Sequence, residues 1–234
     1  MNKPRKLLLV MFVLLTAFLV FSYLFILPFL KYENNLAINL PNHIEEQMQK
    51  RHDTYIPANK ISKYVKEAAV SSQDRHFYSN LGIDVLATFR AFYYILIFGQ
   101  RQGASTITEQ LAKNVYYQDR DNLRTDIETK LFALFITAHF SKDKILEMYL
   151  NEIYYGKNSY GINAAAAKYF KTTPNRLNIY QSAYLIALIN APSILSSNPE
   201  QANEETKNVL LEMLNNNYIS KQEELGAEKF LLSF

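Results

Sequence analysis

Hydrophobic positions along the chain form one long uninterrupted run near the start and then recur with a helical period. Residues 7–30 carry no charge, and three basic residues come before them (Lys3, Arg5 and Lys6). A helix of these 24 residues is about 36 Å long, enough to cross a hydrocarbon core of about 30 Å. A cleaved signal peptide would have a shorter apolar region, about 7–15 residues, followed by a cleavage site of small residues. We therefore predict a transmembrane helix over 7–30.

The charge next to this helix predicts its orientation. Basic residues are enriched on the cytoplasmic side of a membrane, so residues 1–6 are expected in the cytoplasm and the remainder of the chain outside the cell. The chain is thus predicted to be a single-pass protein of the cell membrane, in contact with membrane lipids. It contains no cysteine, which excludes disulfides and thiolate-bound metals. The net charge of +3 is mild, and we expect no nucleic-acid partner.

Two regions follow the transmembrane helix. Residues 31–59 are polar and rich in Asn, so we predict a juxtamembrane linker with at most one short helix. Over 60–234 nearly every apolar pattern has the helical period, without an alternating strand pattern of useful length. We therefore predict a mostly α-helical domain, with helices capped by Asp84 and Ser141 and a central apolar helix through 131–136.

One stretch of this domain has two interpretations. Residues 85–98 are aromatic or apolar at most positions, and Arg90 is their only charge. A helix that is apolar all round is usually buried in a core. Alternatively, such a helix lies in the membrane interface with its aromatic side chains at the level of the headgroups. The pattern alone does not decide between these two locations.

A polar segment in the middle of the chain has the pattern of a helix start that can bind an anion. Thr106 followed by Glu109 is the pattern of a capping box. A helix N-terminus with a glycine before it presents free N–H groups and a positive dipole end, which suit a phosphate. Gln110, Lys113 and Asn114 recur at helical spacing and share a face. Capping alone does not require this polar trio.

Several motifs occur in a fixed order along the chain. Residues 71–84 read Ser-Ser-Gln-Asp-Arg-His-Phe-Tyr-Ser-Asn-Leu-Gly-Ile-Asp, and 102–114 contain Gly-Ala-Ser-Thr-Ile-Thr-Glu-Gln. Residues 145–170 contain Tyr-Leu-Asn-Glu-Ile-Tyr-Tyr-Gly and then Tyr-Gly-Ile. Together these motifs resemble the signatures of the peptidoglycan glycosyltransferases (family 51) over about 61–199. In the first signature, Gln73 occupies the position of the family's catalytic Glu; the last motif is mostly scaffold.

A third signature, Arg-Lys-x-x-Glu in the family, fits in two registers. Pairing Arg124 with Glu128 keeps the family's spacing and makes Glu128 the second acidic residue of the site. Alignment without gaps instead places Thr125 at the Arg position and Thr129 at the acidic position. An Arg–Glu pair four residues apart is also an ordinary surface ion pair, worth about 0.3–0.5 kcal/mol. Both registers stay open.

The resemblance implies a fold and a reaction. The fold would be a lysozyme-like glycosyltransferase domain, preceded here by one transmembrane helix. The acceptor's 4-hydroxyl would attack the donor's anomeric carbon with inversion, so that lipid II is added to a glycan strand and undecaprenyl pyrophosphate leaves. We expect a monofunctional enzyme, because the segment after the motifs leaves no room for a transpeptidase domain. The expected partners are lipid II, the nascent glycan strand and other cell-wall synthesis proteins.

The resemblance also assigns roles to residues. Position 73 would be the base, and cations with a helix start would hold the pyrophosphate together with a divalent metal (Mg or Mn); no organic cofactor is expected. No pair of histidines has metal-ligand spacing, so no protein-side metal site is assigned. The predicted substrate-binding residues are Ser105, Thr106, Gln110, Lys113, Asn114 and Arg124.

Gln73 brings the activity into question. An amide has the shape of a carboxylate but takes no proton near neutral pH, and loss of a general base costs about 100- to 10,000-fold. Three explanations are open: an engineered Glu→Gln change, a natural protein that binds lipid II or a partner without polymerising it, or another carboxylate as base (Asp74, Glu109 or Glu128). The predicted function is a peptidoglycan glycosyltransferase. The alternatives are a non-catalytic lipid II-binding or cell-wall scaffold and, less favoured, a lysozyme-like glycan hydrolase.

Overall fold

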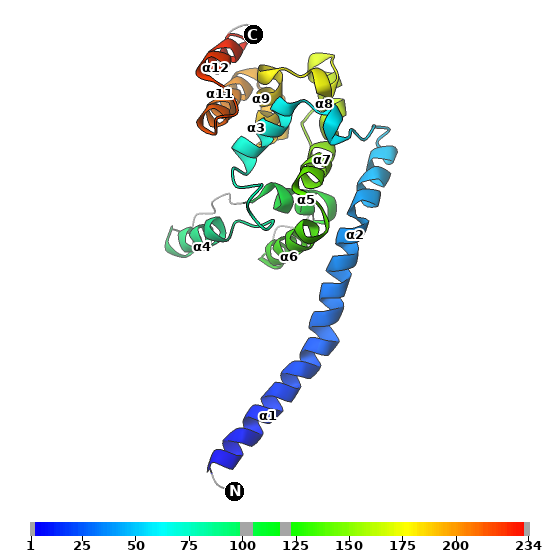
Figure 1. Ribbon diagram of the computed structural model, residues 1–234, viewed down its shortest axis with the longest axis vertical. Helices are drawn as coiled ribbons and strands as arrows, with labels where there is room; N and C mark the ends of the chain where they lie inside the picture. The colour runs from blue at the N-terminus through cyan, green and yellow to red at the C-terminus, as the bar shows by residue number, and fades with distance from the viewer. Residues whose placement is uncertain (1–2, 99–104, 118–122, 232–234) are drawn as a thin grey trace.

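The computed structural model describes residues 3–98, 105–117 and 123–231 (Figure 1). These residues form helices and no strand, apart from one isolated bridge between Tyr154 and Tyr160. The predicted mostly α-helical fold is confirmed. The helices are α1 (Lys3–Phe21), the π-helical turn η1 (Ser22–Ile26), α2 (Leu27–Lys50), η2 (Ala58–Lys60), α3 (Lys63–Gln73), α4 (Val85–Phe98), α5 (Ile107–Tyr116), α6 (Leu123–His139), α7 (Lys142–Glu152), α8 (Gly161–Phe170), η3 (Pro174–Arg176), α9 (Ile179–Leu188), α10 (Pro192–Leu195), α11 (Pro199–Asn215) and α12 (Lys221–Glu228).

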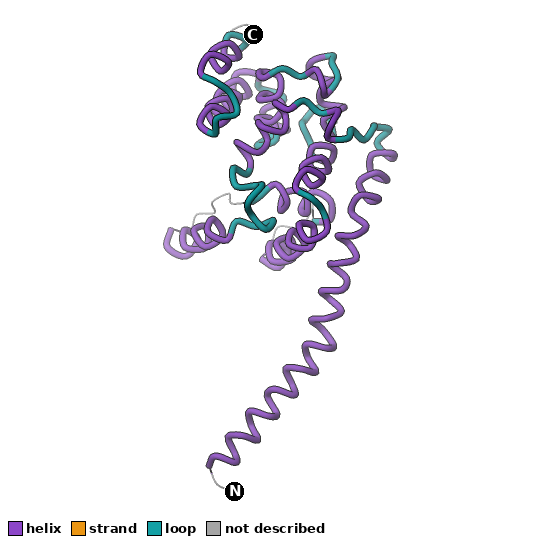
Figure 2. The backbone as a smooth tube through the Cα atoms, viewed as in Figure 1, coloured by secondary structure: helices purple, strands orange, loops and turns teal. Residues whose placement is uncertain are grey.

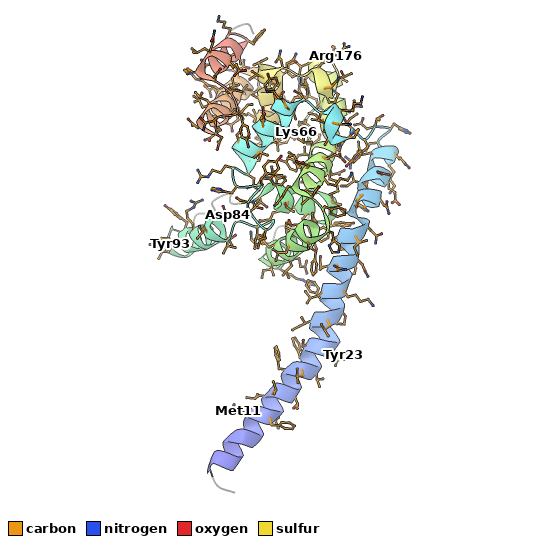
Figure 3. All side chains as sticks on the ribbon, viewed as in Figure 1. Met11, Tyr23, Lys66, Asp84, Tyr93 and Arg176 are labelled. Carbon is orange, nitrogen blue, oxygen red and sulfur yellow. The ribbon has the colours of Figure 1, made fainter. Side chains whose placement is uncertain are left out.

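The first three elements form one long helical rod that projects from the domain (Figures 1 and 2). Large apolar side chains from Met11 to Leu27 are exposed on it, and Met11 and Tyr23 extend away from the rod in Figure 3. In the described part of the chain, this is the one helix long and apolar enough to cross a membrane. These features fit a membrane anchor.

The second half of the rod corrects the prediction of a polar linker over 31–59. Helix α2 continues to Lys50, and Ala37, Leu40, Ile44 and Met48 are buried along one side of it. These residues recur every three or four positions, so they face one direction and pack against α6 and α7. The segment is therefore part of the core of the domain.

Helix α7 lies at the centre of the domain, between two groups of helices (Figure 1). Its Ile145, Leu146, Met148 and Tyr149 are fully buried. Helices α5 and α6 pack together at the end from which the rod projects, while α3, α9 and α11 pack together at the other end. The predicted apolar helix through 131–136 is part of α6, and it contributes Phe132 and Ile136 to the core. It is not the central helix, because α6 lies at one end of the domain and its Leu134 is 36% exposed.

The two predicted helix caps are formed. Asp84 Oδ1 accepts a hydrogen bond from the N–H of Ala87 at 2.8 Å, at the start of α4. Ser141 Oγ accepts one from the N–H of Lys144 at 3.3 Å, at the start of α7. Both caps use a side-chain oxygen to satisfy an N–H group that has no partner within the helix.

Helix α4 extends to one side of the domain, at the end that carries the rod (Figure 1). The side chains of Leu86, Tyr93 and Ile97 are 82%, 56% and 58% exposed, and Tyr93 points outward in Figure 3. The interpretation of 85–98 as a fully buried helix is therefore wrong for these residues. The alternative, a helix at the membrane surface, is consistent with their exposure.

Candidate active site

A cavity of about 760 Å³ opens where the end of α3 meets the starts of α4 and α5. It is also lined by Ile189 and Asn190, which follow α9, and by Glu212 of α11. Five of the residues predicted for the site line it together: Gln73, Asp74, Ser105, Thr106 and Gln110. Residues from five separate stretches of the sequence thus meet at one cavity.

Gln73 is the last residue of α3, and its amide is held from two sides. Its Oε1 accepts a hydrogen bond from Gln110 Nε2 at 3.3 Å, and its Nε2 donates to Asn190 Oδ1 at 3.0 Å. Gln110 is in turn oriented by the buried Tyr149, whose hydroxyl donates to Gln110 Oε1 at 2.9 Å. The amide at position 73 is therefore oriented by partners on α5 and beyond α9.

Asp74 lines the same cavity but is occupied by structural contacts. Both of its carboxylate oxygens accept from Asn80 Nδ2 at 3.0 Å, and Oδ2 also accepts from the N–H of Ile107 at 3.2 Å. Burial raises the pKa of Asp74, against the opposing effect of these hydrogen bonds and of the Lys142 charge. The carboxylate joins α3 to the start of α5, so it is not a free base next to Gln73.

The start of α5 differs from the predicted capping box. Thr106 Oγ1 accepts from the N–H of Glu109 at 3.1 Å, as predicted. The carboxylate of Glu109, however, is buried and binds Lys130 Nζ at 2.7 Å, which orients it toward α6. Because the N–H groups of Ile107 and Glu109 already have protein partners, fewer donors are left for a phosphate than the sequence pattern indicated.

The remaining predicted residues lie outside the set that lines this cavity. Lys113 and Asn114 are further along α5, and Lys113 is exposed. Arg124 Nε binds Glu128 Oε1 at 2.7 Å along α6. These two residues line a separate cavity of about 450 Å³ against Phe29 of α2.

The alternative register for the third signature also stays a prediction. Thr125 and Thr129 are both buried on α6, while Arg124 is exposed. Neither register adds an acidic residue to the described lining of the cavity that contains Gln73.

The cavity contains functional candidates that the sequence reasoning missed. Arg75 and Arg90 line it and supply positive charge. Arg90 had a signal in the sequence, because it is the only charge in an otherwise apolar stretch. Asn190 also had a signal, because 190–193 (Asn-Ala-Pro-Ser) resemble the family's closing turn, but its contact with Gln73 joins positions 117 residues apart and was not predicted.

The described residues do not fit a metal site held by the protein. No group of three or more His, Cys, Asp or Glu side chains in the described ranges could hold a metal ion. Two of the carboxylates at the cavity, Asp74 and Asp84, already accept hydrogen bonds from Ile107 and Ala87.

The last motif acts mainly as a clamp on the segment after α2. Asn151 exchanges hydrogen bonds with the backbone N–H and C=O of Ile56, both at 2.8 Å. Glu152 forms an ion pair with Arg51 at 2.5 Å. These contacts agree with the predicted scaffold role, and Tyr149 additionally reaches the site through Gln110.

The fold and the cavity define a class of protein: an α-helical domain on one apolar rod, with a polar binding site between its helices. A family model described as "Transglycosylase" matches residues 41–214. The chain belongs to this transglycosylase family, and the resemblance to the peptidoglycan glycosyltransferases is confirmed. The match begins within α2, in agreement with the packing of that helix into the domain.

Two kinds of relative are similar to the chain. "Penicillin-binding protein 1F" of Bacillus subtilis (strain 168) is 40% identical over 178 residues, which are 74% of this chain and 25% of that protein. "Monofunctional glycosyltransferase" of Staphylococcus haemolyticus (strain JCSC1435) is 36% identical over 176 residues, 71% of this chain and 65% of that protein. The protein of the same name in Staphylococcus aureus (strain JH9) is 33% identical over 177 residues, 72% of this chain and 66% of that protein. The chain thus matches from a quarter to about two thirds of the length of these relatives.

Proposed function

We propose that the chain is a peptidoglycan glycosyltransferase that binds lipid II and the nascent glycan strand in the 760 Å³ cavity. The observation that carries this proposal is the cavity itself, which combines position 73 with Arg75, Arg90 and Gln110. The names of the relatives, which include monofunctional glycosyltransferases, support the same activity. The domain would work on the outer face of the cell membrane, with residues 1–6 in the cytoplasm.

The proposed reaction is one displacement with inversion. The acceptor's 4-hydroxyl oxygen forms a bond to the anomeric carbon of the donor as the bond from that carbon to the pyrophosphate oxygen breaks. Negative charge grows on the leaving pyrophosphate, and the guanidinium groups of Arg75 and Arg90 can stabilise it. Ser105 and Gln110 can supply hydrogen bonds that orient the sugars, whereas the Thr106 hydroxyl is held by the Gly82 carbonyl and the Glu109 N–H.

The hydroxyl proton must also leave, and Gln73 cannot accept it. Its amide can orient the hydroxyl through the carbonyl oxygen. Three carboxylates line the cavity: Asp74 is buried, Asp84 caps α4, and Glu212 is exposed. Glu212 is therefore the candidate for a replacement base, although it lies on a different helix from position 73.

A second candidate function is lipid II binding without turnover. The specific observation in its favour is the amide at the base position, where the loss of a general base costs about 100- to 10,000-fold. Such a protein would keep the substrate contacts of the cavity and act as a scaffold for other cell-wall synthesis proteins.

The deciding experiment is lipid II polymerisation by the full chain beside its Q73E and E212Q variants, with lipid II binding measured in parallel. We expect slow polymerisation by the natural chain and an increase of up to about 100- to 10,000-fold in Q73E. Equal rates in the natural chain and in Q73E, with loss of activity in E212Q, would assign the base to Glu212. Binding without turnover in every variant would establish the second function, and absence of both binding and turnover would contradict both.

A further inference from the structure

A chain of hydrogen bonds runs through the candidate site and ends on a carboxylate outside it. From Gln73 it continues to Asn190, whose Nδ2 donates to Glu205 Oε1 of α11 at 2.5 Å. The other oxygen of Glu205 accepts from Asn208 Nδ2 at 3.0 Å. In the opposite direction the chain passes through Gln110 to the hydroxyl of Tyr149. From Tyr149 to Glu205, five side chains from five parts of the fold are thus linked, each donating to the next.

The carboxylate of Glu205 determines that direction. An ionised carboxylate only accepts hydrogen bonds, so the amide atom of Asn190 that faces Glu205 must be its nitrogen. The carbonyl oxygen of Asn190 then faces position 73, and the atom of residue 73 next to it must carry a hydrogen. The nitrogen of the Gln73 amide meets this requirement at 3.0 Å.

The other end of the chain is matched in the same way. Gln110 offers its oxygen to Tyr149 and its nitrogen to Gln73, so the second polar atom of residue 73 must be an acceptor. An amide satisfies both neighbours at once. An ionised carboxylate at position 73 would satisfy Gln110 but would oppose the carbonyl oxygen of Asn190.

We propose that Glu205 is a positioning residue that orients Asn190, so that the site holds an amide at position 73 in a matched arrangement and favours the protonated form of a carboxylate there. For a carboxylate to ionise at this position, the side-chain amide of Asn190 must flip, so that its nitrogen faces residue 73. This flip would place the carbonyl oxygen of Asn190 against the carboxylate of Glu205, and the two oxygens would repel each other. The inference rests on the proposed function, because position 73 is the family's base position. Its main test measures the pKa of a carboxyl at that position and does not depend on turnover.

Other charged or titratable groups share the cavity with position 73. Those lining the cavity are Asp74, Arg75, His76, Asp84, Arg90 and Glu212. They remain the same when only residue 205 is changed, so a comparison at fixed residue 73 isolates the effect of Glu205. Glu204 offers a matched control, because it is the neighbouring carboxylate on α11 and is exposed.

The experiment follows the ionisation of the introduced carboxyl in Q73E, Q73E/E205Q and Q73E/E204Q. Each full-length variant is labelled with ¹³C at the Glu side-chain carboxyl, reconstituted in nanodiscs and titrated by NMR. The signal of the carboxyl at position 73 is identified by its absence from the spectrum of the chain with Gln73. We expect the carboxyl at position 73 to have a raised pKa in Q73E and in Q73E/E204Q. In Q73E/E205Q the amide at 205 can donate to a turned Asn190, and the pKa should fall by about one unit.

Equal pKa values in Q73E and Q73E/E205Q, or the same fall in Q73E/E204Q, would overturn the proposal. If Q73E does not fold, the natural chain provides a second measurement. E205L removes the acceptor for Asn190, so the side-chain amide NMR signals of Asn190 and Gln73 should both shift, whereas E204L should leave them in place. Unchanged signals in E205L would also overturn the proposal.

A polymerisation assay separates this inference from the proposed function. If Q73E is active, its rate should rise with pH at a higher pH than that of Q73E/E205Q. Absence of turnover in all variants, together with the expected pKa difference between Q73E and Q73E/E205Q, would contradict the enzymatic function and still support the role of Glu205. Turnover with the same pH profile in Q73E and Q73E/E205Q would support the enzymatic function and overturn the proposed role of Glu205.

Discussion

At position 73, an amide and a carboxylate differ in hydrogen-bond direction as well as in proton affinity. The side chain of Gln73 donates to Asn190 and accepts from Gln110 at the same time. A substitution to Glu keeps the shape but changes one of these two contacts from attraction to repulsion. The recovery of activity in Q73E therefore depends on the neighbours of the residue and not on the residue alone.

Asp74 gives a prediction about the pH dependence of stability. Burial raises its pKa above the ordinary value of 3.8, so the folded chain keeps this proton at pH values where the unfolded chain has lost it. The free energy of unfolding contributed by Asp74 is then largest below 3.8 and falls as pH rises through the folded pKa. In D74N this decrease should be absent, as measured by thermal unfolding between about pH 4 and 7.

The control for this measurement is D126N, which changes an exposed Asp on α6. Its profile should follow that of the natural chain. Parallel profiles for D74N and the natural chain would mean that Asp74 titrates alike in the folded and unfolded states.

The members of the site could be predicted from the sequence only where motifs place them. Gln73, Ser105 and Gln110 belong to two signatures, and the structure brings these signatures to one cavity. The pairing of Gln73 with Asn190 depends on how α3 and α9 pack, and no local pattern encodes such a contact. Arg124 was predicted from a motif but does not line the cavity that contains Gln73; it pairs with Glu128 and lines the separate cavity against Phe29. A motif match does not determine which side of α6 a residue occupies.

At the scale of elements, the helices with clear caps and apolar stripes were predictable, and α2 was not. Its buried stripe consists of Ala37, Leu40, Ile44 and Met48, with many polar residues between them. Pro41 and the Asn residues resemble loop signals. Packing against α6 stabilises the helix in spite of these signals, since tertiary contacts outweigh weak local preferences.

This packing leads to a prediction with a matched control on the same helix. Leu40 is fully buried, whereas Ile38 is 50% exposed. L40A should lower the free energy of unfolding by about 2–5 kcal/mol, because it removes buried methyl groups and leaves a cavity. I38A should change it by less than about 0.5 kcal/mol.

Chemical denaturation of the full chain in detergent micelles would compare L40A with I38A. Similar, small effects of both substitutions would show that α2 is a tether and not part of the core.

At the scale of the whole molecule, the packing of α2 relates the domain to the membrane. Because the rod is continuous from α1 into α2 and α2 is held by the core, the domain has a defined end toward the bilayer. Helices α4 and α6 lie at that end, and α12 lies at the opposite end (Figure 1). A bilayer around α1 would therefore lie on the side of the domain that carries the exposed apolar residues of α4.

The arrangement predicts two different environments for two exposed apolar side chains. Ile97 on α4 is 58% exposed and Leu225 on α12 is 49% exposed, and the chain has no cysteine, so I97C and L225C each allow a single spin label. In nanodiscs, the label at position 97 should be more accessible to oxygen than to a polar nickel reagent, because oxygen partitions into lipid. The label at position 225 should show the opposite preference. Equal accessibility to the nickel reagent at both positions would place α4 in water, and the apolar surface of that helix would then require a protein partner in place of the bilayer.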